Sequence, residues 1–136
     1  MIRGSCLCGA VAWEADALSG PIVNCHCRTC QKAHSAAFAT AARSLRSSFR
    51  WTRGEAARRS FESSPGKLRW FCGECGSHLM AEWTAQDQVI LRIGSADEGL
   101  AGAEPAFHIW VSHQPAWDPG PDDRLPRYPE AAPPVR

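Results

Sequence analysis

Cys25-His26-Cys27-Arg28-Thr29-Cys30 places three thiols within six residues of this 136-residue chain. The other four cysteines form two pairs, Cys6-Leu7-Cys8 and Cys72-Gly73-Glu74-Cys75. Short spacings of this kind favour metal ligation over a disulfide framework, and an odd number of cysteines does not allow complete pairing. We therefore interpret all seven cysteines as zinc ligands.

The two cysteine pairs together supply four thiolates. In Cys72-Gly73-Glu74-Cys75-Gly76, both thiolates can face one ion, and Gly76 lacks a Cβ where the chain must turn away. Cys6 and Cys8 lie two residues apart, so in an extended chain they point to the same side. Zinc bound by four thiolates has no position left for a substrate. We predict that these four cysteines hold a structural zinc, which ties the N-terminus to the middle of the chain.

Cys25, Cys27 and Cys30 leave the fourth position of a tetrahedral zinc unfilled by cysteine. Three protein ligands and one exchangeable position are the arrangement of catalytic zinc sites. A thiol substrate suits that position, because zinc favours sulfur and lowers the pKa of a bound thiol. The triplet therefore predicts a second, catalytic zinc and the attack of a thiolate on a carbonyl carbon.

Two other assignments fit the same spacings. Cys27-x-x-Cys30 and Cys72-x-x-Cys75 could form a single two-knuckle zinc site, which would leave the other three cysteines as incidental thiols. Alternatively, His26 or His34 could supply a fourth ligand to the triplet and make it a second structural site. Two zinc ions per chain would favour the four-plus-three division, and one ion would favour the two-knuckle site.

Size and charge narrow the class of protein. The length suits one domain, and 15 basic against 14 acidic residues give a net charge of +1, which creates no general attraction for nucleic acid or an anionic membrane. No segment approaches the roughly 18 apolar residues of a membrane span, and the first residues do not resemble a signal peptide. We expect one cytoplasmic zinc-binding domain over residues 1–136, with no nucleic-acid or membrane partner. The oligomeric state is open at this stage.

Short segments with alternating apolar residues predict a mainly β fold with little helix. Strands are expected at residues 10–15, 49–53, 58–63, 67–71, 78–83, 88–94 and 107–112. Ser64-Pro65-Gly66 is typical of the turn of a hairpin, which would deliver Cys72 and Cys75 at its end.

Three further segments complete this interpretation. A short helix is expected at residues 28–33 behind a Thr29 cap, whereas helix and strand compete over residues 36–42. From Pro115 onward the chain has seven prolines in 22 residues. We expect this tail, at about 118–136, to lie extended on the surface or to fray.

The cysteine motifs and their surroundings resemble the glutathione-dependent formaldehyde-activating enzyme family. The resemblance is carried by Gly4-Ser5-Cys6-Leu7-Cys8-Gly9-Ala10-Val11, Cys25-His26-Cys27-x-x-Cys30-Gln31-Lys32, Ser63-Ser64-Pro65-Gly66, Arg69-x-Phe71-Cys72-x-x-Cys75-Gly76-Ser77, Gly94-x-x-Asp97, Pro105-x-x-His108-Ile109 and Trp117. It covers nearly the whole chain, and seven cysteines in order make it specific.

The resemblance implies a β-tent fold of short antiparallel sheets, with a structural zinc on Cys6, Cys8, Cys72 and Cys75 and a catalytic zinc on Cys25, Cys27 and Cys30. The activity that it implies is S-(hydroxymethyl)glutathione synthase, a carbon–sulfur lyase that acts on the adduct of glutathione and formaldehyde. The family also includes centromere protein V. A non-catalytic zinc-binding interaction module, or the same chemistry on a different thiol, is therefore kept as an alternative.

The chain departs from the family pattern just after the triplet. Ser35-Ala36 stands where the family commonly has Gly-Ala, which is where transfer of the family's substrate is least secure. His34 could donate a hydrogen bond to a ligand or cap the turn, and we expect the cap. For His26 we expect a structural hydrogen bond, because extended geometry would turn its ring away from the metal.

Basic residues of the predicted hairpin offer a second place to bind a substrate. They could bind the carboxylates of a glutathione-like ligand through charge-assisted hydrogen bonds, or they could form a solvated strand face. We expect the solvated face for all of them, namely Arg58, Arg59, Lys67 and Arg69.

Overall fold

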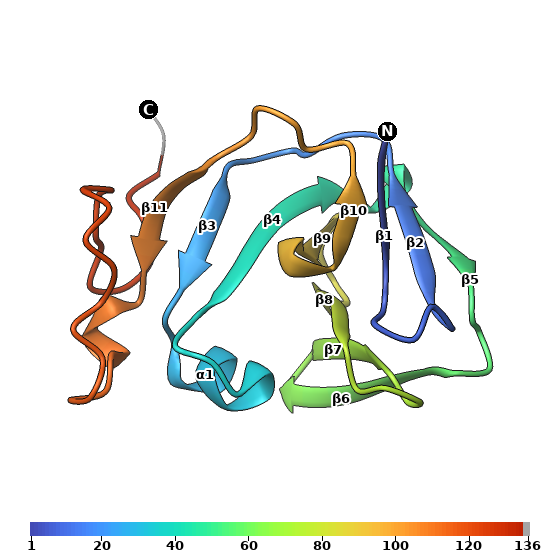
Figure 1. Ribbon diagram of the computed structural model, residues 1–136, viewed down its shortest axis with the longest axis horizontal. Helices are drawn as coiled ribbons and strands as arrows, with labels where there is room; N and C mark the ends of the chain where they lie inside the picture. Colours follow the sequence, from blue (N-terminus) through green and yellow to red (C-terminus); the bar gives the residue numbers. More distant parts are fainter. Residues whose placement is uncertain (135–136) are drawn as a thin grey trace.

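A computed structural model describes residues 1–134 and places them in two β-sheets (Figure 1). The smaller sheet contains β1 (Ile2–Ser5), β2 (Ala12–Ala15), β5 (Phe49–Arg53) and β10 (Ala96–Glu98). Its strand order is β10-β1-β2-β5, and all of its pairs are antiparallel.

Seven strands form the larger sheet. They are β3 (Ile22–Cys25), β4 (Ala39–Leu45), β6 (Arg58–Ser64), β7 (Lys67–Cys72), β8 (His78–Trp83), β9 (Gln88–Arg92) and β11 (Pro105–Ile109). The order is β11-β3-β4-β9-β8-β7-β6, and the pairing is antiparallel except for the parallel pair of β11 and β3. The predicted mainly β fold is confirmed.

Helical structure is sparse over residues 1–134. The α-helix α1 spans Arg28–His34, and short 3-10 helices occur at η1 (Arg46–Ser48), η2 (Ile93–Ser95) and η3 (Val111–His113). Figure 1 shows α1 below the lower ends of β3 and β4. η2 and η3 begin within two predicted strands, so β9 and β11 end earlier than the apolar pattern indicates.

The core is centred on Trp13 of β2, whose side chain is fully buried. It belongs to one cluster with Val11, Leu79 and Leu91, which joins residues of both sheets. Burying such a ring contributes roughly 3 kcal/mol or more through removal of apolar surface from water. Gly4 leaves room for the ring, because a Cβ at that position would lie 2.3 Å from Trp13 Cε2.

The predicted hairpin is formed by β6 and β7. Ser64 pairs with Lys67 across the turn, and Gly66 has a φ of +83°, which favours glycine. β7 ends at Cys72, and Gly76 adopts a φ of +80° after the second cysteine of the pair. The hairpin thus delivers Cys72 and Cys75 to one end of the larger sheet.

The proline-rich tail follows the outer edge of β11, where Figure 1 shows the orange and red segments side by side. The amide of His108 donates to the carbonyl of Pro126, and the amide of Tyr128 donates to the carbonyl of His108, both at 2.9 Å. These bonds attach part of the tail to the sheet without a regular strand. Residues 135 and 136 of the predicted tail lie outside the described residues.

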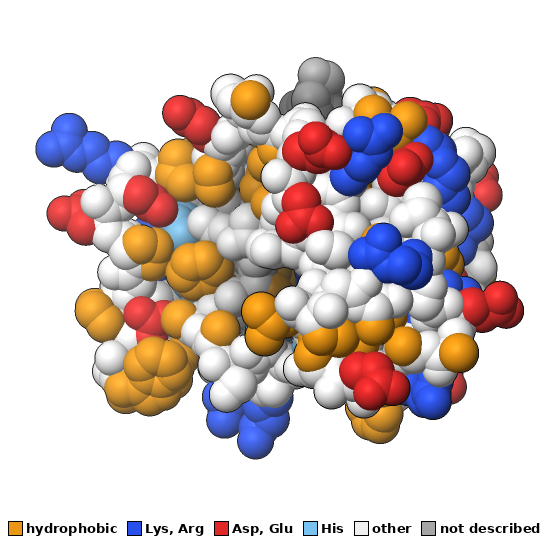
Figure 2. Space-filling model, turned by 45° about the vertical axis from the view of Figure 1, so that its right-hand side comes forward, with side chains coloured by type: hydrophobic (Ala, Val, Ile, Leu, Met, Phe, Trp, Pro, Cys, Tyr) orange, Lys and Arg blue, Asp and Glu red, His pale blue; other side chains and the backbone are white. Residues whose placement is uncertain are grey.

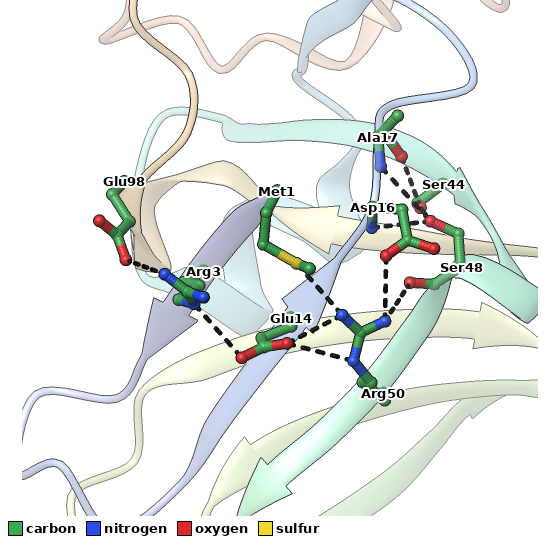
Figure 3. A network of polar contacts seen from close by, with 9 residues as sticks. All are labelled: Met1, Arg3, Glu14, Asp16, Ala17, Ser44, Ser48, Arg50 and Glu98. Atoms are coloured by element: carbon green, nitrogen blue, oxygen red, sulfur yellow. Dashed lines mark hydrogen bonds and ion pairs between the residues drawn. The ribbon is translucent and has the colours of Figure 1, made fainter.

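Charged side chains of both signs are interspersed on the face shown in Figure 2. Figure 3 shows one group of them, in which Glu14 of β2 accepts from Arg3 and Arg50 on the neighbouring strands. Arg50 also donates to Asp16 at 3.1 Å, and Arg3 donates to Glu98 at 3.0 Å. The four strands of the smaller sheet are thus linked by ion pairs on their exposed side. No helix of the described residues is long and apolar enough to span a membrane.

Candidate metal centres

Four cysteine sulfurs meet where the β1–β2 loop approaches the end of β7. The Sγ atoms of Cys6, Cys8, Cys72 and Cys75 all lie within 4.8 Å of one another. Cys6 and Cys8 are 3.7 Å apart, and Cys8 and Cys72 are 3.8 Å apart. Tetrahedral zinc with bonds of about 2.3 Å to sulfur requires edges of about 3.8 Å, whereas a disulfide requires about 2.0 Å. The donor set therefore fits a tetrahedral metal ion.

Hydrogen bonds to this cluster favour its thiolate form. The amide of Val11 donates to Cys6 Sγ at 3.2 Å, and the amide of Glu74 lies 3.4 Å from Cys72 Sγ. A hydrogen bond with the Ser77 hydroxyl, at 3.2 Å, leads the contacts that lower the pKa of Cys75 to about 5. Donors of this kind stabilise negative charge on sulfur in a metal site.

The second cluster forms where β3 leads into α1. The sulfurs of Cys25, Cys27 and Cys30 lie within 4.8 Å of one another, with Cys25 at the end of the strand and Cys30 buried in the helix. Cys27 is the N-cap of α1, and its Sγ accepts from the amide of Cys30 at 3.3 Å. The predicted Thr29 cap is wrong, because the N-cap is Cys27, two residues earlier, and its sulfur accepts the hydrogen bond.

Histidine does not complete either group. Among residues 1–134, the second cluster holds three metal-binding side chains of the His, Cys, Asp and Glu types. His26 Nε2 lies 2.8 Å from His108 Nδ1, and His108 Nε2 lies 2.8 Å from Asp123 Oδ2. His26 thus makes the structural hydrogen bond that we expected, and it joins the triplet to the tail.

The geometry also separates the remaining alternatives. Cys27 and Cys30 lie in one cluster and Cys72 and Cys75 in the other, so the two-knuckle assignment finds no support in the arrangement. His34 ends α1 and packs against His78 with ring centroids 4.5 Å apart. The expected cap by His34 is wrong, since the backbone amide of Ser35 closes the helix on the carbonyl of Gln31.

Ser35 adopts the left-handed conformation with a φ of +49°. A residue that ends a helix in this way is usually glycine, because a Cβ makes the conformation costly. The position where the family commonly has glycine is therefore a helix C-terminus in this chain. Serine in place of the family's glycine therefore lies at the end of α1, and Ser35 adopts the left-handed conformation that glycine favours.

Arg69 contacts the second cluster from β7. Its Nη1 and Nη2 lie 3.7 and 3.9 Å from Cys30 Sγ, and its Nε donates to Ser63 Oγ at 2.8 Å. Contacts with the sulfurs of Cys25 and then Cys27, followed by the charges of Arg92 and Arg69, hold the pKa of Cys30 far below its usual range. Positive charge beside the Cys30 sulfur therefore favours its thiolate form.

The other basic residues of the hairpin behave differently from Arg69. Arg58 stacks over the ring of Trp51 at 4.7 Å, and Arg59 is exposed and donates to the carbonyl of Ala56. Lys67 lies over Trp83 at 5.3 Å and is half-buried. The expected solvated face is wrong for Arg69, which is 3% exposed, because its side chain lies against Cys30 of the second cluster.

Arg92 at the end of β9 is the residue near the cluster that sequence reasoning missed. It is 5% exposed, and burial lowers its pKa while the Cys30 thiolate opposes that change. The available signal was a charged residue within the apolar run Val89-Ile90-Leu91-Arg92-Ile93. Burying an arginine costs free energy unless opposite charge or hydrogen-bond acceptors compensate it.

Comparisons with known proteins agree with this architecture. The chain is similar to a crystal structure of a Rhodobacter sphaeroides protein with a TM-score of 0.60 and 24% identity, over 76% of this chain and 91% of that chain. This similarity concerns the fold. No curated protein matched the sequence. The model of the family described as glutathione-dependent formaldehyde-activating enzyme matches residues 1–113. With both cysteine clusters inside the matched residues, the chain belongs to the glutathione-dependent formaldehyde-activating enzyme family.

Proposed function

We propose that this protein is a zinc-dependent carbon–sulfur lyase resembling S-(hydroxymethyl)glutathione synthase. Its family couples the activation of formaldehyde to glutathione. In this proposal Cys6, Cys8, Cys72 and Cys75 hold a structural zinc, and Cys25, Cys27 and Cys30 hold the catalytic zinc. We further propose that residues 1–136 act as a single domain in the cytoplasm on a small thiol such as glutathione.

One observation supports the proposal more than any other. Two groups of cysteine sulfurs with the same close spacing differ in the number of ligands, four in one and three in the other over the described chain. Four thiolates fill a tetrahedral ion, whereas three leave a position for an exogenous ligand. The division of the seven cysteines is therefore also a division between structure and chemistry.

A zinc ion held by Cys25, Cys27 and Cys30 would lower the pKa of a thiol substrate and keep it as a thiolate at neutral pH. The chain's own groups prepare that site. Arg69 places positive charge against Cys30 Sγ, which favours the thiolate. The side-chain amide of Gln31 donates to the carbonyls of His26 and His113, at 2.7 and 2.9 Å, and so fixes α1 against the neighbouring segments.

The overall reaction joins the thiol and the aldehyde without an oxidant or reductant. The thiolate sulfur attacks the carbonyl carbon, a carbon–sulfur bond forms, and the electron pair of the broken π bond moves to oxygen. The proton lost by the thiol is returned to that oxygen, giving a hydroxymethyl thioether. The reverse reaction releases the thiol and the aldehyde.

The test is nuclear magnetic resonance exchange spectroscopy of glutathione and ¹³C-labelled formaldehyde in the presence of the zinc-loaded protein. We expect the protein to accelerate exchange between free formaldehyde and its glutathione adduct. Cys27→Ser should return the exchange to about the uncatalysed rate while keeping the melting temperature, because it removes a ligand of the open site only.

Cys75→Ser is the matched control, since it removes a ligand of the other site. It should unfold the domain or lower its stability by several kcal/mol, of the order of the net stability of a small protein. The proposal is contradicted if both variants stay folded and active. Folded, zinc-loaded protein that does not accelerate the exchange would favour a non-catalytic interaction module, and acceleration with another thiol alone would change the substrate.

A further inference from the structure

A cavity of about 700 Å³ adjoins the four-cysteine cluster and reaches the C-terminal end of α1. One side of its wall includes Cys6 and Ser77, and another includes His34 at the end of α1. β8 and β9 contribute His78 and Arg92 to the same wall. The cavity is large enough to admit a substrate of small-molecule size.

Arg92 is the most deeply buried charged residue of this wall. Its Nε and Nη2 atoms are shielded from solvent and have no hydrogen-bond partner within residues 1–134. Among those residues it also forms no ion pair with a carboxylate within 4.0 Å. Arg69, the other buried arginine, differs because it contacts both Cys30 and Ser63. The negative charge of the Cys30 thiolate favours the Arg92 guanidinium but accepts no hydrogen bond from its Nε or Nη2. Buried N–H groups without an acceptor are costly, so these two atoms of Arg92 call for an acceptor from outside the described chain.

Two histidines of the wall also have a buried ring nitrogen without a hydrogen-bond partner in the described residues. These nitrogens are His34 Nε2 and His78 Nδ1. Burial and then the charge of Arg92 lower the pKa of both rings, that of His34 to about 4. Each is therefore a neutral imidazole at pH 7, which carries one N–H donor. Unpartnered buried polar groups that gather in one wall are typical of a binding site.

The distribution of charge around the cavity gives the sign of the ligand. Asp97 is the acidic residue of the wall, but it is exposed and already accepts from Ser5 Oγ at 2.6 Å. Arg92 provides the buried charge, and Thr40 and the two imidazoles provide neutral polar groups. The Nε–Nη2 edge of an arginine carries the two parallel N–H groups that match a carboxylate.

We infer that this cavity binds a carboxylate group of the substrate and that Arg92 is its charge partner. The inference rests on the proposed function for the kind of molecule that enters, a thiol or an aldehyde. It adds that a carboxylate of this molecule is recognised in the cavity, and it assigns Arg92 as a specificity-determining residue. Two sources of the carboxylate fit, namely the thiol itself, as in glutathione, and an aldehyde that bears a carboxylate, as in glyoxylate.

The test is isothermal titration calorimetry on the zinc-loaded protein with ligands that lack a free thiol. S-methylglutathione retains both carboxylates, and its diethyl ester retains neither. We expect the ester to bind at least about tenfold more weakly, since hydrogen bonds to charged groups contribute that much to affinity. This comparison uses the natural sequence and does not depend on the folding of a variant.

Arg92→Gln should weaken the binding of S-methylglutathione about tenfold or more and leave the weak binding of the ester unchanged. The matched control is Arg43→Gln, which removes an exposed arginine of the adjacent strand β4. This control should bind both ligands as the natural protein does. Glyoxylate is titrated in parallel, and Arg92-dependent binding of glyoxylate alone assigns the carboxylate to the aldehyde.

The inference is overturned if the acid and the ester bind equally and neither S-methylglutathione nor glyoxylate responds to Arg92→Gln. Its failure is distinct from failure of the proposed function. Calorimetry with a methylated thiol reports carboxylate binding even if the metal site does no chemistry. Conversely, thiol-dependent exchange of formaldehyde can persist when the carboxylate plays no part.

Discussion

Arg69 and Arg92 are two residues whose burial near the second cluster is hard to predict from the sequence. Arg69 belongs to a basic hairpin, in which charged residues are ordinarily solvated, but its side chain is buried against Cys30 of the second cluster. Arg92 interrupts an apolar run, and that interruption was a usable signal. The cysteine spacing could be read from the sequence because ligand geometry is local. The charges near Cys30 come from Arg69 and Arg92, which lie 39 and 62 residues further along the chain. A local sequence pattern does not show that residues so far apart lie close together in the fold.

Glu14 gives a prediction for pH at the level of a residue. Hydrogen bonds from Arg50 and then Arg3 lower the pKa of Glu14 below its usual value of 4.5. Its contribution to stability is therefore present above about pH 4.5 and is lost as the pH falls through the lower folded-state pKa. We expect Glu14→Gln to lower the melting temperature modestly at pH 7, and this deficit should disappear in strong acid.

Thermal unfolding monitored by circular dichroism between pH 2 and pH 7 measures this effect. Glu55→Gln is the control, because Glu55 is exposed and forms no ion pair with any described residue. A deficit of Glu14→Gln that stays constant with pH would show that the charge of Glu14 does not stabilise the folded state.

At the level of elements, the sequence predicted whether a segment is helix or strand better than it predicted where the segment begins and ends. The β6–β7 hairpin was predicted at its turn, since Pro65-Gly66 is a strong local signal. The helix at α1 was also predicted, but its cap was assigned to Thr29 because cysteine is not an expected cap residue. β1, β3 and β10 were missed, since strands of three or four residues are too short for an alternating pattern to stand out.

The packing of β1 against β2 provides a prediction at this scale. Gly4→Ala would place a Cβ 2.3 Å from the buried ring of Trp13, so the ring or the strand must shift. We expect a loss of about 1–3 kcal/mol in the free energy of unfolding, as is usual for an overpacked core. Urea denaturation followed by tryptophan fluorescence measures this loss.

Gly20→Ala is the control for this substitution. No heavy atom lies within 4 Å of a Cβ built at Gly20, and its φ is outside the left-handed region. We expect its stability to match that of the natural protein within about 0.5 kcal/mol. Equal stabilities of the two alanine variants would mean that β1 does not pack closely on Trp13.

In the whole molecule, the two cysteine clusters join segments that are distant in sequence. The four-cysteine cluster connects the β1–β2 loop to the end of β7, and the triplet lies between β3 and α1. Cysteine spacing predicted this division, but it left the two-knuckle assignment open, and the arrangement of the sulfurs separates the two. The cavity beside the four-cysteine cluster could not be predicted, because its wall is assembled from four separate segments by the pairing of both sheets.

The central claim is that the two clusters bind two metal ions and that one of these ions is open to a thiol. Cobalt substitution tests it most directly, since tetrahedral cobalt with thiolate ligands absorbs visible light and responds to a new sulfur ligand. We predict two cobalt ions per chain and a shift in the absorption of one of them on titration with glutathione. Cys27→Ser should keep one ion and lose the shift. One ion per chain, or two ions whose absorption is unchanged by glutathione, would contradict the account.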